Sequence, residues 1–111
     1  MMISYKDCFV IKIIITYSYY PNRRNMPLCI GNRFSVWAID DEKNNTSAQI
    51  IRLESPIYPE TSGSVIIALL QPETLGENLR ANKILNWGSV ELPSGTFKIT
   101  EIFGDKYQEN I

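Results

Sequence analysis

Residues 9–17 read Phe-Val-Ile-Lys-Ile-Ile-Ile-Thr-Tyr, a run in which every second side chain is apolar and most residues are β-branched. A period of two is typical of a β-strand with one face in a hydrophobic core. The alternate set on this strand is Val10, Lys12, Ile14 and Thr16, and Ile14 in it indicates that the opposite face is partly covered. The residues that we expect to face inward are Phe9, Ile11, Ile13, Ile15 and Tyr17.

Similar short runs follow along the chain, separated by turn-forming residues such as the polar break at 20–25 and the charged loop at 40–45. In the run at 33–39, Phe34, Val36 and Ala38 form the apolar set. Strict alternation would therefore place Trp37 on the outer face. We expect strands at residues 26–30, 33–39, 48–53, 64–70, 83–88 and 95–103, with a short helical turn at 72–80 and the last two strands joined across 92–95.

Six or seven short strands without a helix of ordinary length indicate an all-β fold. The arrangement that this pattern favours is a small antiparallel β-barrel or a sandwich, and we expect the barrel. A length of 111 residues suits a single domain, which we take to span residues 1–111.

The composition argues against several classes of function. The chain has 11 basic and 12 acidic residues, so it lacks the basic excess that drives general nucleic-acid binding. It has no histidine, which is the commonest general base and a common metal ligand. The acidic residues 40–42 lack the spacing of a calcium loop and are expected to form a solvated loop. We therefore expect no catalytic residues, no metal and no cofactor.

The two cysteines, Cys8 and Cys29, are too few for a disulfide framework. If the strands at 9–17 and 26–30 form a hairpin, Cys29 lies opposite Thr16. Cys8 is then roughly 26 Å away, beyond the reach of a disulfide. The apolar stretch at 8–20 is interrupted by Lys12 and is too short to span a bilayer. We expect two free thiols in a cytoplasmic protein that does not bind membranes.

A set of strands and turns occurs in one order along nearly the whole chain: Phe9–Tyr17, Arg23 or Arg24 with Pro27 and Gly31, Phe34–Ala38, Tyr58-Pro59, Val65–Leu70 with Pro72, Leu79-Arg80, and Gly95–Gly104. This order resembles the C-terminal β-barrel domain of elongation factor Tu. The resemblance implies a translation-factor-like barrel, with tRNA binding as one possible activity. It does not extend to GTP hydrolysis, because the chain has no Gly-x-x-x-x-Gly-Lys-Ser/Thr motif.

One cluster suggests a binding surface. Arginine and aromatic side chains anchor many interfaces and also suit phosphates and stacked bases, although the tyrosines could simply pack on the end of a barrel. We expect a non-enzymatic module that binds a macromolecule, with a protein partner favoured. A tRNA- or nucleic-acid-binding accessory domain and a toxin-neutralising immunity protein are the alternatives. The candidate binding residues are Tyr19, Tyr20, Arg23, Arg24 and Trp37.

Overall fold

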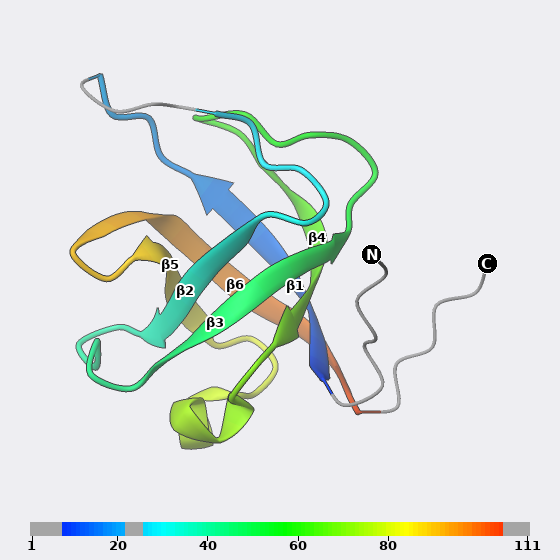
Figure 1. The fold of residues 1–111 in the computed structure, drawn as a ribbon, viewed down its shortest axis with the longest axis vertical. Helices are drawn as coiled ribbons and strands as arrows, with labels where there is room; N and C mark the ends of the chain where they lie inside the picture. Colours follow the sequence, from blue (N-terminus) through cyan, green and yellow to red (C-terminus); the bar gives the residue numbers. More distant parts are fainter. Residues whose placement is uncertain (1–7, 22–25, 106–111) are drawn as a thin grey trace.

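The first strand, β1 (Phe9–Tyr17), has a hydrogen-bonded partner along each of its edges. In the computed structural model, which describes residues 8–21 and 26–105, β1 pairs with β4 (Ser62–Leu69) on one side and with β6 (Leu92–Gly104) on the other. The remaining strands are β2 (Arg33–Ala38), β3 (Asn45–Arg52) and β5 (Ile84–Ser89). The closed order is β1-β4-β3-β2-β5-β6, and every neighbouring pair is antiparallel (Figure 1). The predicted all-β barrel is therefore confirmed, with six strands.

A short 3-10 helix, η1 (Pro72–Asn78), links β4 to β5 and buries Leu75 in the core, where the sequence predicts a helical turn. Pro72 stands in its first turn, where a proline loses no hydrogen bond. Within the described ranges, no helix is long and apolar enough to cross a membrane.

The alternating side chains of β1 fill the interior as predicted. Ile11, Ile13 and Ile15 are fully buried, Tyr17 is buried beside them, and Phe9 packs against the same cluster. The outer face of β1 is partly covered, as expected: Val10 is fully buried in a small cluster with Ile51 and Ala68, whereas Ile14 is 45% exposed. Its cross-strand neighbours are Ser64, which is too small to cover it, and Lys98, whose charge favours solvent.

The predicted strand at residues 26–30 is wrong. In this segment only Leu28 forms a β-bridge, to Ile57. Pro27 has no backbone N–H to donate, and Gly31 turns the chain with φ at 93°. These two residues limit the ladder to one position between them.

The predicted connection at residues 92–95 is also wrong, because Ser89 and Leu92 are already paired and β6 begins at Leu92. Pro93 lies inside β6, opposite Gly88, where the register shifts. Such an irregularity tolerates the missing N–H of a proline, which a regular ladder does not.

Trp87 ties three strands together at one end of the interior. Its indole Nε1 donates a hydrogen bond to the carbonyl oxygen of Thr16 on β1 at 2.9 Å. Its ring centroid lies 5.2 Å from that of Tyr17 and 5.0 Å from that of Phe34. The close approach of β6 to both partners at this point requires Gly95, which is paired with Tyr17 and with Trp87.

We predict that Gly95→Ala strongly destabilises the barrel. A β-carbon at position 95 would overlap the carbonyl oxygen of Thr16 and lie 2.9 Å from Nε1 of Trp87. The free energy of unfolding, measured by urea denaturation, should fall by about 3 kcal/mol, as in overpacked cores. Gly31→Ala is the control, since Gly31 has open space around it and costs only about 1 kcal/mol of backbone strain at its positive φ. Equal losses in the two variants would contradict the tight contact at Gly95.

Candidate functional site

Two irregular segments, residues 26–31 and 53–61, are joined over the end of the barrel at which β1 terminates (Figure 1). The backbone N–H of Leu28 donates to the carbonyl of Ile57 at 2.8 Å, and that of Ile57 donates to the carbonyl of Leu28 at 3.2 Å. The N–H of Glu60 donates to the carbonyl of Tyr17 at 2.6 Å, which ties the second segment to the end of β1.

The hydroxyl of Tyr17 ties the first segment to the same strand. The ring of Tyr17 is buried in the core, and its hydroxyl donates to the carbonyl oxygen of Met26 at 2.7 Å. The amide oxygen of Asn32 then accepts a hydrogen bond from the N–H of Cys29 at 2.8 Å and closes the following turn. Residues 26–32 are therefore anchored at both ends.

Large apolar side chains gather on this end of the molecule. They are between 38% and 61% exposed, and all stand on the anchored segments or directly after β1. Soluble proteins expose single apolar residues routinely, but several at one place indicate an interaction surface. We call this set the tyrosine end: Tyr19, Tyr20, Met26, Ile30 and Tyr58.

The candidate residues from the sequence are only partly brought together. Tyr19 and Tyr20 lie in the tyrosine end and are exposed, as expected. Arg23 and Arg24 lie outside the described residues.

The prediction that Trp37 is exposed beside these tyrosines is wrong, because Trp37 is only 3% exposed. Three antiparallel pairings separate β1 from β2, so the two strands run in opposite directions and end at opposite ends of the barrel. Trp37 stands near the end of β2, flanked by Asn45 and Asn86, and η1 contacts β2 and β3. Alternation sets the face on which a side chain lies, but it does not predict what covers that face.

The thiol prediction is confirmed, but the register behind it is wrong. Cys8 and Cys29 are both free. β1 pairs with β4 and β6 and not with residues 26–30, so Cys29 does not lie opposite Thr16. Cys8 precedes the start of β1, whereas Cys29 lies in the segment over the other end of that strand.

The barrel is hollowed beside the tyrosine end. A depression of about 390 Å³ is lined by Tyr17, Phe34 and Trp87, and also by Met26 and by polar residues such as Arg33 and Ser94. Because the three aromatic rings are packed against one another, the aromatic part of the lining is rigid.

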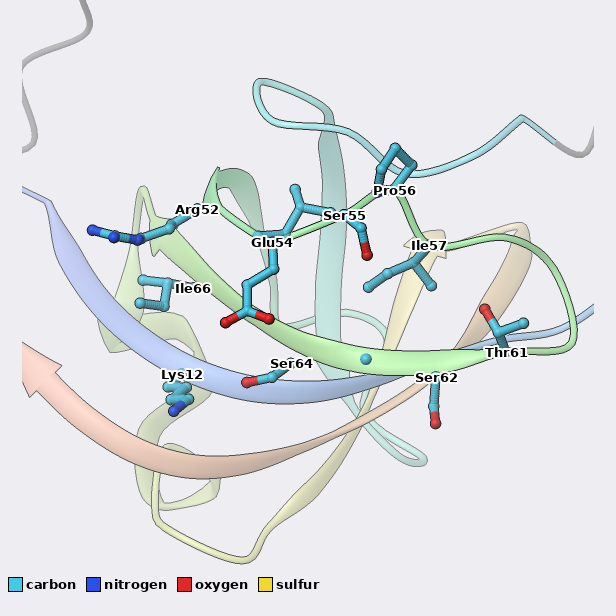
Figure 2. A pocket seen from close by; sticks show the side chains of 12 residues that line it. Lys12, Arg52, Glu54, Ser55, Pro56, Ile57, Thr61, Ser62, Ser64 and Ile66 are labelled. Carbon is cyan, nitrogen blue, oxygen red and sulfur yellow. The ribbon is translucent and has the colours of Figure 1, made fainter.

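A second hollow follows the outside of β4. This groove, which we call the β4 groove, has a volume of about 460 Å³ and lies between residues 53–57 and residues 61–66, with Lys12 at its edge (Figure 2). The carboxylate of Glu54 hangs over β4 between Lys12 and Ser64 (Figure 2). Gly63 allows residues 53–57 to pack closely on β4, since a β-carbon at position 63 would lie 2.9 Å from Cδ1 of Ile57.

A β-bulge decides which charges line the β4 groove. Thr46, Ala48 and Ile50 are the buried residues of β3 before the bulge, so an unbroken alternation would turn Arg52 inward as well. The register shifts between Ile50 and Arg52, and Arg52 instead pairs with Ile66 on the outer face. Bulges commonly re-aim a side chain in this way.

The described part of the chain contains no group of three or more His, Cys, Asp or Glu side chains placed to hold a metal ion. Comparison with known proteins found no matching family model, no matching curated protein and no matching solved structure.

We predict that Tyr17→Phe loosens the tyrosine end without opening the barrel. Losing the hydroxyl frees the carbonyl of Met26 and should cost about 1 kcal/mol of unfolding free energy, the usual net value of a hydrogen bond. Amide hydrogen exchange should speed up in residues 26–31 more than in β1.

Tyr58→Phe is the matched control, because Tyr58 is exposed and removal of its hydroxyl should leave both measurements unchanged. Exchange that rises uniformly through the barrel in Tyr17→Phe would contradict a local anchoring role.

Proposed function

We propose that this chain is a non-enzymatic β-barrel module that recognises a protein partner through the tyrosine end. The observation that carries the proposal is the gathering of exposed apolar residues on segments held to the barrel by backbone hydrogen bonds. Tyrosine is enriched among the residues that dominate binding energy at protein interfaces.

Because residues 26–31 and 53–61 are anchored to the barrel, the binding surface is already formed before the partner binds. The bridge between Leu28 and Ile57 and the hydroxyl of Tyr17 fix the backbone from which Met26 and Tyr58 project. Binding to a fixed backbone avoids much of the ordering entropy that a mobile loop would lose. Tyrosine adds a large rigid contact area with few rotatable bonds.

The adjoining depression supports an anchored interface. Its lining combines the rings of Tyr17, Phe34 and Trp87 with polar groups, and it has room for one inserted side chain of the partner. Interfaces commonly centre on such a filled pocket, surrounded by contacts that exclude water.

We retain kinship with the C-terminal barrel of elongation factor Tu as part of this proposal. The closed six-stranded barrel is compatible with it. A near-balanced charge favours a protein over tRNA as the partner, because phosphate contacts need a basic surface.

Site-specific photo-crosslinking in the native host tests the proposal. A benzoylphenylalanine at position 19 or 58 should crosslink to one and the same protein, and at position 39 it should not. Ile39 is an exposed apolar residue after the end of β2, at the opposite end of the barrel. Crosslinks only from position 39, or crosslinks to RNA from positions 19 and 58, would contradict a protein site at the tyrosine end. A toxin recovered from positions 19 and 58 would place the chain among immunity proteins.

We predict that Tyr19→Ala with Tyr58→Ala weakens binding of the crosslinked protein about 30-fold, as expected for the loss of an interface anchor. The matched control is Ile39→Ala with Leu70→Ala, which truncates two exposed apolar residues elsewhere and should leave the affinity unchanged. Both variants should keep the thermal stability of the wild type. Affinity that falls equally in both variants would show that the tyrosine end is not the specific site.

A further inference from the structure

Two cations, Lys12 and Arg52, line the β4 groove and flank one apolar side chain. Ile66 on the outer face of β4 is paired with Lys12 on β1 and with Arg52 on β3. Directly opposite residues in neighbouring strands have β-carbons about 5 Å apart, so the two cations stand on either side of Ile66. The bulge that precedes Arg52 is what brings the guanidinium group to this face.

Neither cation forms an ion pair with a residue in the described part of the chain. Glu54 stands on the groove loop, and Glu101 is the cross-strand partner of Lys12 on β6. Glu101 partly balances Lys12, whereas the cross-strand partner of Arg52 among the described residues is the uncharged Ile66. Arg52 is therefore the cation that an acidic ligand would meet first.

The side chains on the floor of the groove recur at the spacing of residues in an extended peptide. Ser62, Ser64 and Ile66 are successive outward residues of β4, so their side chains recur every two residues, about 6.7 Å apart. A peptide in extended conformation that lies along β4 presents one face at the same repeat. The serine hydroxyls can donate to its carbonyls and accept from its N–H groups.

The lining also discriminates between classes of ligand. Glu54 points over the floor and would repel a polyphosphate or a nucleic-acid backbone, but it can accept hydrogen bonds from peptide N–H groups. Among the described residues that line the groove there is no aromatic side chain on which a sugar ring or a base could stack. A ligand with one carboxylate and a row of N–H donors matches all of these features.

We infer that the β4 groove is a second binding site, which takes an extended peptide segment with an acidic side chain placed at Arg52 and Lys12. The inference rests on the proposed function in that the natural ligand is a segment of a protein. The groove is contiguous with the tyrosine end through residues 57–61, so one partner can occupy both. The two sites can nevertheless be tested separately, because the tyrosine end is altered at Tyr19 and Tyr58 and the β4 groove is altered at Arg52.

Selection from a phage-displayed library of random peptides tests this inference with the whole chain. Selection on the wild type should enrich peptides with an acidic residue at a fixed position, and selection on Arg52→Glu should not. A synthetic peptide of the enriched sequence should bind Arg52→Glu at least about tenfold more weakly, as expected when a hydrogen bond to a charged group is lost. Lys98→Glu is the matched control, since it makes the same charge change on the outer face of β6 outside the groove.

Amide chemical shifts in NMR spectra should change in residues 52–66 when the peptide is added and should stay unchanged when inorganic phosphate is added. The inference is overturned if no peptide is enriched, if Arg52→Glu and Lys98→Glu bind the peptide equally, or if phosphate alone shifts the groove. Tyr19→Ala with Tyr58→Ala should keep peptide binding. The two proposals therefore fail separately. If Tyr19→Ala with Tyr58→Ala leaves partner binding unchanged, the proposal for the tyrosine end fails, and if Arg52→Glu leaves peptide binding unchanged, the proposal for the β4 groove fails.

Discussion

The architecture depends on the pairing of β1 along both edges. A strand with free N–H and C=O groups on one side invites association with other chains, and closure removes that edge. β1 meets β4 and β6 in registers that place Ile13 between Val65 and Ile99, so the apolar face of three strands converges on one line of the interior. The pairing also determines where β1 ends, and therefore where residues 26–31 and 53–61 can be attached.

Departures from the regular ladder create the two candidate surfaces. The single bridge between Leu28 and Ile57 lies outside the six strands and holds the segments that carry the tyrosine end. The bulge before Arg52 changes the phase of β3 and supplies a cation to the β4 groove. The regular part of the barrel supplies rigidity, and its irregularities determine which side chains meet solvent.

Strands were predictable from the sequence wherever one face is buried, because a period of two then appears in the residue pattern, as in β1. The bulge before Arg52 left no such signal, because Ile50 faces the interior and Ile51 is buried in the outer cluster with Val10 and Ala68, so the alternation holds up to Ile51. The burial of Trp37 could not be predicted, because it depends on the neighbouring strands and on η1, which is distant in sequence. Tyr58 was missed as a site residue because its turn meets residues 26–31 only in the folded chain.

Nuclear Overhauser contacts between backbone protons test whether β1 closes the barrel and whether the segments at residues 26–31 and 53–61 are joined at its end. We expect contacts from Ile13 to both Val65 and Ile99, together with a contact between Leu28 and Ile57 in the same molecule. Contacts from Ile13 to only one of its two partners would contradict a closed barrel. Absence of the contact between Leu28 and Ile57 in an otherwise closed barrel would contradict the anchored tyrosine end.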